Sequence, residues 1–327
     1  MLLMMGAMAQ VYSSDVASPR EEAVEFKNGE VQLAGTLVLP PTEGPHPAVV
    51  FVHGSGPATR SQALALARLF AAEGIAGLAY DKRGSGDSTG NWVTSSLEDL
   101  AEDAIAGLEL LKKQPQIDAE RVGLWGHSQG CWVGTLATEL SKKIDFLIMV
   151  SGGGATPHEA EMHSYRQSFV RAGLSDSEQL EATQLLDRYF RFLGTGKDRK
   201  ALEDAIETSR SKKWFELVPI ERILPSEKNQ PNWQWVATFD PVPYIQKMQL
   251  PVLVLFGAED HANPVSLSAK KWQEGLLAAG NQHHSVQVLQ GANHDLRTGG
   301  HGGPFADGYL TMMFSWVHQK TSKPPAC

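Results

Sequence analysis

The chain has 327 residues, of which 42% are hydrophobic and 20% charged, a balance typical of a globular protein with a large buried core. Its 37 acidic and 29 basic residues give a formal charge of −8, and the basic residues form no cluster beyond pairs such as Lys112-Lys113. This charge pattern argues against a nucleic-acid partner. Beyond the N-terminus no stretch approaches the roughly 18 apolar residues of a membrane span, so no transmembrane segment is predicted.

The N-terminal nine residues are apolar and end in an Ala-Met-Ala triplet that resembles a signal-peptidase cleavage site. A signal peptide should start with basic residues, but the first basic residue here is Arg20. Two interpretations of residues 1–20 therefore stay open. They are a signal peptide of a secreted or periplasmic protein, or the disordered start of a cytoplasmic one.

Strand-like and helix-like patterns alternate along most of the chain. Asn28-Gly29 is a strong hairpin signal between two strand-like runs, and continuous apolar runs further on predict strands covered on both faces. Ser95 is expected to start a long helix, because Glu98 completes a capping box, and Pro115 closes that helix. The predicted strands are residues 22–27, 31–39, 48–52, 75–80, 122–125, 146–150, 252–256 and 286–289, with helices at 61–73, from 95, at 131–140 and from Pro304.

This order of elements predicts an α/β protein with a doubly wound, mainly parallel eight-stranded sheet. Ligands bind at the carboxyl ends of the strands in such sheets, so the search for catalytic residues can be confined there. The alternation stops over residues 155–249, where helical patterns dominate. We therefore expect a helical cap, or lid, inserted into a core made of residues 21–154 and 250–320.

Aromatic residues are frequent in this insertion, and their commonest role would be to pack it onto the core. Because the insertion leaves the sheet after the strand at 146–150, it should lie over the strand ends. Some of its aromatic side chains would then roof a substrate pocket. Trp214 and Trp233 are the candidates for that contact.

A Gly-x-Ser-x-Gly sequence at residues 126–130 directly follows the apolar run 122–125. This setting predicts a strand, a sharp turn and a helix, with Ser128 at the strained apex and glycines where side chains would clash. The helix directs its N-terminal N–H groups toward the turn, where an oxyanion would form. The sequence therefore predicts Ser128 as a nucleophile rather than part of an ordinary turn, with His127 as a candidate substrate contact.

A serine nucleophile needs a base to remove its proton and an acid to orient that base. In the chain order serine, acid, histidine, the acid should follow a late strand and the histidine the last strand. Asp260 and His294 occupy those places. His301, in a glycine-rich loop, is a rival base, whereas His283 and His284 precede the last strand and would lie at the wrong end of the sheet.

Two backbone N–H groups are needed to bind the oxyanion. Gln129, directly after the nucleophile, would supply one, and Ser55 in the small-residue loop after the strand at 48–52 would supply the other, with Gly54 as the alternative. His53 is expected to brace this loop. The loop from Asp81 to Ser88 is interpreted as internally hydrogen-bonded, with a substrate role for Asp81 or Arg83 as the alternative.

The two cysteines, Cys131 and Cys327, give no basis for a disulfide framework or a structural zinc site. Both are interpreted as free thiols, and Cys131 is expected to pack under the helix as a small apolar residue. We expect no metal and no cofactor.

With these residues placed, the chain resembles the α/β-hydrolase family from about residue 48 to residue 317. The resemblance implies a Ser128, Asp260, His294 triad, an oxyanion hole from the Ser55 and Gln129 N–H groups, and a helical cap after the sixth strand. The His-Gly-Ser-Gly-Pro and Asp-Lys-Arg-Gly-Ser-Gly sequences are similar to those of bacterial esterases and prolyl-oligopeptidase-like enzymes. Serine at the apex of the turn distinguishes the chain from the dehalogenase, epoxide-hydrolase and dienelactone-hydrolase branches. The loop after the strand at 48–52 differs from the three-glycine oxyanion loop of lipases.

The expected activity is hydrolysis of small to medium carboxylic esters through an acyl-enzyme. A peptidase or aminopeptidase would use the same triad, but it would need a site for a terminal charge, and the sequence of the insertion shows none. A thioesterase or acyltransferase for CoA-linked substrates is a further alternative, although no basic patch for phosphates is evident. The non-enzyme alternative is a ligand receptor on the same fold.

Overall fold

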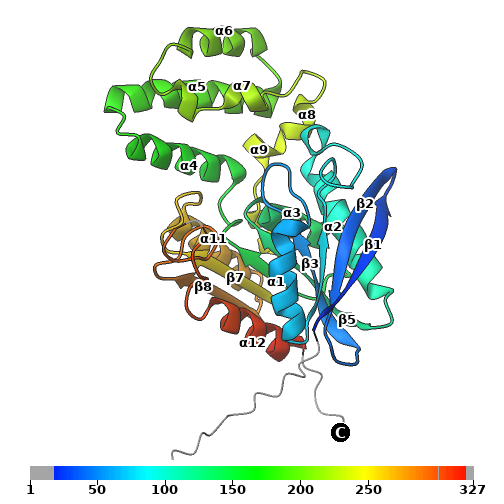
Figure 1. The fold of residues 1–327 in the computed structure, drawn as a ribbon. Helices are drawn as coiled ribbons and strands as arrows, with labels where there is room; N and C mark the ends of the chain where they lie inside the picture. The colour runs from blue at the N-terminus through cyan, green and yellow to red at the C-terminus, as the bar shows by residue number, and fades with distance from the viewer. Residues whose placement is uncertain (1–17, 301, 322–327) are drawn as a thin grey trace, which may run out of the picture.

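The computed structural model describes residues 18–300 and 302–321 (Figure 1). Three predictions lie outside the described residues, namely the nature of residues 1–17, the rival base His301 and the thiol of Cys327. No helix in the described ranges is both long enough and apolar enough to cross a membrane.

One eight-stranded sheet forms the centre of the molecule, as the sequence predicts. Its strands follow the spatial order β1-β2-β4-β3-β5-β6-β7-β8. The β1–β2 and β2–β4 pairs are antiparallel, and every later pair is parallel. The bounds are β1 Arg20–Asn28, β2 Val31–Leu39, β3 His46–Val52, β4 Ala76–Tyr80, β5 Ile117–His127, β6 Leu147–Val150, β7 Val252–Gly257 and β8 His284–Leu289.

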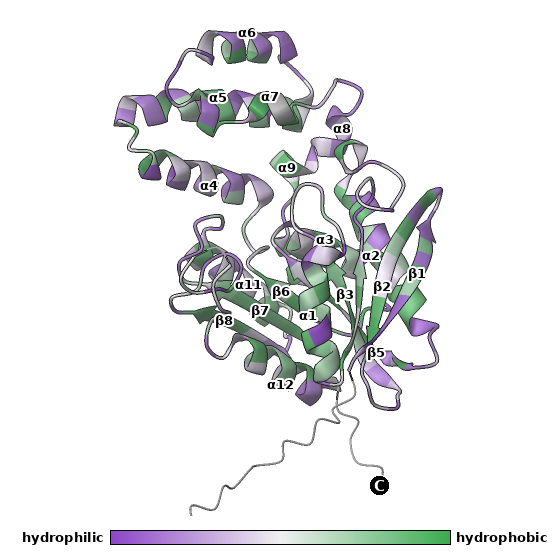
Figure 2. Cartoon of the chain, viewed as in Figure 1, coloured by the Kyte–Doolittle hydropathy of each residue, from purple (hydrophilic) through white to green (hydrophobic). Residues whose placement is uncertain are grey.

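Helices cover both faces of the sheet (Figure 1). On one face α1 (Ser61–Ala72) and α12 (Tyr309–Thr321) bury the apolar side chains of one set of strand positions. On the other face α2 (Leu97–Lys112), α3 (Gln129–Leu140) and α11 (Val265–Ala278) bury the alternate set. This doubly covered arrangement explains why β3, β6 and β7 are buried along their whole length and mostly apolar, which Figure 2 shows in green.

The helical insertion, residues 155–249, connects β6 to β7 and forms the upper part of the molecule in Figure 1. It has its own core, in which α5 buries an apolar face that includes Leu185, Leu186, Tyr189, Phe190 and Leu193. Its elements are α4 Pro157–Arg171, α5 Asp176–Thr195, α6 Arg199–Ser209, η2 Phe215–Leu217, α7 Ile220–Ile223, α8 Gln230–Trp233, α9 Trp235–Thr238 and α10 Val242–Ile245.

Side-chain and backbone hydrogen bonds attach the insertion to the core at both of its ends. Near its start, the Trp132 Nε1–H donates to the Ala155 carbonyl over 2.9 Å, and Lys271 pairs with Glu159. Near its end, Asn232 and Trp233 donate to the carbonyls of Thr94 and Val93, both over 2.6 Å. Those carbonyls belong to η1 (Trp92–Thr94), a short helix that precedes α2.

Two predicted helix starts are wrong. The capping box of α2 is formed by Ser96 and Asp99, one residue later than predicted, because the Ser95 Oγ instead accepts from the Arg83 guanidinium over 3.0 Å. The terminal helix begins at Tyr309 rather than Pro304. Residues before it are held in an isolated β-bridge between Arg297 and Phe305 and cannot adopt helical hydrogen bonding.

Candidate active site

The turn between β5 and α3 holds Ser128 with φ 54° and ψ −117°, a conformation that side-chain-bearing residues rarely adopt. Its backbone N–H donates to the Val150 carbonyl over 2.9 Å, which fixes the turn to β6. A Cβ at position 126 would overlap the carbonyl of residue 130, and a Cβ at position 130 would overlap the Val52 carbonyl. The two glycines are therefore required for this turn to form.

Asp260 and His294, predicted from separate strand ends, are in direct contact. The His294 Nδ1 lies 2.8 Å from the Asp260 Oδ2, and the carboxylate is fully buried whereas the imidazole is 25% exposed. The other oxygen of Asp260 accepts from the backbone N–H groups of Ala262 and Asn263 over 2.7 and 3.1 Å. Because the carboxylate accepts at Nδ1, the proton of neutral His294 resides there and Nε2 is free to act as a base.

His127 joins the serine turn to the loop that carries His294. Its ring stacks on Trp125 and lies 4.9 Å from the His294 ring, centroid to centroid. Its Nε2–H donates to the His294 carbonyl over 3.2 Å. Burial, together with the neighbouring His294, lowers the pKa of His127 to about 4, so it is neutral at physiological pH. The structure thus places His127 between the turn and the base, rather than among the residues that line the cavity described below.

The loop after β3 approaches Ser128 closely, since a Cβ at position 54 would lie 3.5 Å from the Ser128 Cβ. Within the described part of the chain, neither the Ser55 N–H nor the Gln129 N–H has a hydrogen-bond acceptor. His53 braces the loop against the end of β4, with its Nε2 2.6 Å from the Tyr80 carbonyl. Burial lowers the pKa of His53 to about 4, which keeps it neutral and in that bracing contact.

Lys82 is a residue that the sequence reasoning missed. Its side chain is buried, and its Nζ donates to the carbonyls of Gly54 and Gly56 over 2.9 and 3.0 Å. A third bond, of 2.8 Å, reaches the Gln129 side-chain oxygen. Lys82 therefore ties together the two segments that carry the predicted oxyanion donors. Its place two residues after the buried strand β4 was the available signal.

Burial lowers the pKa of Lys82 from 10.5 to about 7. Between these values the unfolded chain binds a proton that the folded chain releases, so the free energy of unfolding should rise with pH. Relative to Lys82→Met, the wild-type protein should gain up to about 1.4 kcal/mol per pH unit. Urea unfolding at several pH values between about 7 and about 10 measures this difference. Parallel pH profiles for the two proteins would contradict it.

The neighbours of Lys82 have structural contacts. Asp81 accepts from the backbone N–H groups of Arg60 and Asp87 over 2.7 and 2.9 Å. The Arg83 guanidinium makes two bonds of 2.7 Å to the buried Asp103 carboxylate. These contacts match the internally hydrogen-bonded loop that the sequence predicts, and both Asp81 and Arg83 are buried.

A cavity of about 180 Å³ lies between the helical insertion and the serine turn. On the core side Ser55, Gly56 and Gln129 line it, so it opens directly at the two predicted oxyanion segments. Trp233 is part of its wall, as predicted, but Trp214 lies in the core of the insertion instead. The remaining wall is mostly aromatic and also contains one carboxylate, with Trp92, Trp132, Pro157, Glu161, Tyr165, Tyr189, Phe190, Ile223, Trp235 and Val236 completing it.

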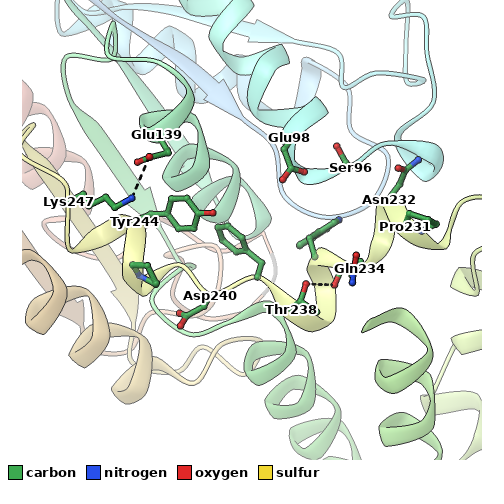
Figure 3. A pocket seen from close by; sticks show the side chains of 13 residues that line it. Ser96, Glu98, Glu139, Pro231, Asn232, Gln234, Thr238, Asp240, Tyr244 and Lys247 are labelled. Atoms are coloured by element: carbon green, nitrogen blue, oxygen red, sulfur yellow. Dashed lines mark hydrogen bonds and ion pairs between the residues drawn. The ribbon is translucent and has the colours of Figure 1, made fainter. Parts of the chain in front are cut away.

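A larger and more open groove, of about 610 Å³, lies beside α9 and α10 (Figure 3). An ion pair between Lys247 and Glu139 closes one end of it. None of the predicted catalytic or oxyanion residues lines this groove. Trp235 belongs to the walls of both the groove and the smaller cavity, and it therefore separates them.

Cys131 is a fully buried free thiol on α3, and its burial agrees with the predicted packing under that helix. Its Sγ lies 3.4 Å from the Gly126 carbonyl and 3.3 Å from the Val150 carbonyl, either of which can accept its single S–H, and burial raises the pKa of the thiol well above its usual value. Across the described ranges, no three His, Cys, Asp or Glu side chains gather in a way that could hold a metal ion.

Comparisons with known proteins agree on one family. A model of the alpha/beta hydrolase family matches residues 49–307. Esterase EstD of Thermotoga maritima is 25% identical over 286 residues, which are 85% of this chain and 61% of EstD, so the chain spans less than two thirds of that relative. Thiohydrolase apmlB of Arthrinium phaeospermum is 22% identical over 80% of this chain and 87% of its own length.

Among solved structures, an esterase from Pyrococcus furiosus superposes with a TM-score of 0.57 at 16% identity. The match covers 92% of this chain and 90% of that one. At this identity the likeness establishes the shared fold.

Proposed function

Because the chain belongs to the alpha/beta hydrolase family, we propose that it is a serine hydrolase that cleaves small to medium carboxylic esters through an acyl-enzyme. The observation that carries this proposal is the hydrogen bond from His294 to the buried Asp260, together with a serine held at positive φ directly after His127, which bonds to the His294 carbonyl. Esterase EstD is an esterase by name, which supports the choice of an ester bond.

In the proposed mechanism, the His294 Nε2 removes the proton from the Ser128 Oγ as that oxygen attacks the ester carbonyl carbon. The carbonyl oxygen becomes an oxyanion and accepts from the Ser55 and Gln129 N–H groups, which have no acceptor in the described chain. The tetrahedral intermediate then collapses, and His294 gives its proton to the leaving alcohol. Water repeats these steps on the acyl-enzyme and releases the acid.

The buried Asp260 carboxylate stabilises the imidazolium that forms during each half of the reaction. The proposed role of Lys82 is to hold the oxyanion loop against α3, since its three bonds reach both segments. In the same scheme the helical insertion acts as a cap over the ester-binding cavity, and a cavity of about 180 Å³ favours short acyl or alcohol groups.

A substrate panel separates this proposal from its alternatives. We expect hydrolysis of 4-nitrophenyl acetate and butyrate, much slower hydrolysis of the octanoate, and no cleavage of aminoacyl anilides. Because one relative is named a thiohydrolase, the panel includes an acetyl thioester of a simple thiol, which the same nucleophile could attack. A fluorophosphonate probe should label the wild-type protein covalently. Absence of labelling together with absence of turnover would favour a ligand receptor.

A further inference from the structure

The cavity beside the serine turn contains a carboxylate without a partner. Pro157, Glu161 and Tyr165 follow one another at four-residue spacing, so they lie on one face of α4, and all three line the cavity. In the described chain Glu161 has no hydrogen bond and no ion pair. Glu159, two residues earlier, differs in both respects, because it caps α4 and pairs with Lys271.

The surroundings of Glu161 make the ionised form of its carboxyl unfavourable unless a cation binds next to it. Its partly buried side chain shares the cavity with seven aromatic rings, and burial alone raises the pKa of its carboxyl. No lysine or arginine is part of the described cavity wall. The Lys82 side chain, whose Nζ lies 5.7 Å from the centroid of the Trp92 ring, already donates to three acceptors on the core side. The aromatic rings are Trp92, Trp132, Tyr165, Tyr189, Phe190, Trp233 and Trp235.

Aromatic faces around a carboxylate form a favourable site for an ammonium group. The ring faces attract a cation through their quadrupoles, and the carboxylate adds a full negative charge. A volume of about 180 Å³ suits a small group of this kind rather than a long chain. The net charge of −8 also favours the approach of a cation over that of an anion.

We propose that this cavity binds an ammonium group, so that the preferred esters carry a positively charged amine next to the scissile bond, with Glu161 as the specificity-determining residue. This inference rests on the proposed ester hydrolysis. It also provides the negatively charged site that the sequence of the insertion did not reveal. The charge could belong to the alcohol or to the acyl part of the ester.

Two pairs of esters with matched shape test the proposal. Acetylcholine and 3,3-dimethylbutyl acetate differ only in a quaternary nitrogen or carbon on the alcohol side. Ethyl 4-(trimethylammonio)butanoate and ethyl 5,5-dimethylhexanoate differ in the same way on the acyl side. For at least one pair, the wild-type kcat/KM should favour the charged ester by about tenfold or more. The pair that shows the preference identifies the side on which the cation is recognised.

Glu161→Gln should lower this charged-to-neutral ratio about tenfold, because it removes the charge and keeps the shape. Glu216→Gln is the matched control, since Glu216 is an exposed carboxylate of the same insertion and lines none of the described cavities. It should leave the ratio unchanged. A wild-type ratio of one or below for both pairs, or the wild-type ratio in Glu161→Gln, would overturn the proposal. An unchanged ratio in Glu161→Gln is also the result expected if Glu161 is protonated and only donates a hydrogen bond.

A binding measurement separates failure of this inference from failure of the proposed function. Tetramethylammonium should quench the tryptophan fluorescence of the wild-type protein, and neopentyl alcohol should not, because four tryptophans line the cavity. Glu161→Gln, with its fold checked by thermal melting, should lose this quenching. Quenching without turnover of any ester would refute ester hydrolysis and still support the ammonium-binding site. Turnover of the neutral esters without charge preference or quenching would refute the ammonium site alone.

Discussion

Replacing Ser128 with alanine should lower kcat for a short nitrophenyl ester by about four to six orders of magnitude. The change removes the proposed nucleophile, and only background catalysis by the oxyanion donors and substrate binding would remain. Steady-state kinetics on 4-nitrophenyl acetate, with the variant purified from a host background whose own esterase activity has been measured and subtracted, determines the loss. Fluorophosphonate labelling should disappear in the same variant.

The alanine side chain has the same backbone preferences as serine at φ 54°, so the strain of the turn should be retained and the variant should melt near the wild-type temperature. Ser151→Ala is a suitable control, because Ser151 is another buried serine at positive φ, with φ 55°. It should keep turnover within about tenfold. Near-normal turnover by Ser128→Ala would show that another residue is the nucleophile.

Asp260→Asn should lower kcat by about four orders of magnitude while the protein stays folded. The backbone N–H groups of Ala262 and Asn263 would hold the amide oxygen where one carboxylate oxygen now lies. The amide NH₂ would then face the His294 Nδ1, which would have to accept rather than donate. The imidazole proton would move to Nε2, and the base would be lost.

The neighbouring carboxylate supplies the control for that experiment. Asp295→Asn removes an equal charge next to His294, but Asp295 lies 3.7 Å from the His127 Nε2, a nitrogen of a ring that is neutral at physiological pH. Its kcat should change less than about tenfold. Equal losses in the two variants would indicate that charge near the base, rather than the tautomer of His294, controls the rate.

The sheet could be predicted from the sequence because buried parallel strands are continuous apolar runs with turn signals between them. Helix starts were harder, as α2 shows. Ser95 and Ser96 are each followed three residues later by an acidic residue, so both satisfy the capping pattern. The choice of Ser96 depends on Arg83, which engages Ser95 from a distant loop, and no local pattern contains that contact.

The same distinction applies to the candidate site. Ser128, Asp260 and His294 could be proposed from their places at strand ends, since topology alone brings strand ends together. Lys82 could not, because its three acceptors come from two other segments whose packing the sequence does not reveal. For Glu161 the missing information was the rotation of α4 about its axis, which decides whether position 161 faces solvent or the cavity.

The attachment of the insertion to the core has a consequence for how substrates would be selected by size. Asn232 and Trp233 bond to the core near the end of the insertion, and Trp132 and Lys271 of the core bond to the insertion near its start. Movement of the insertion away from the core as a rigid unit would break several such contacts, each worth on the order of 1 kcal/mol. Molecules would then enter the cavity by rotation of individual rings such as Trp235. The volume of the cavity would limit the size of a substrate before any ligand binds.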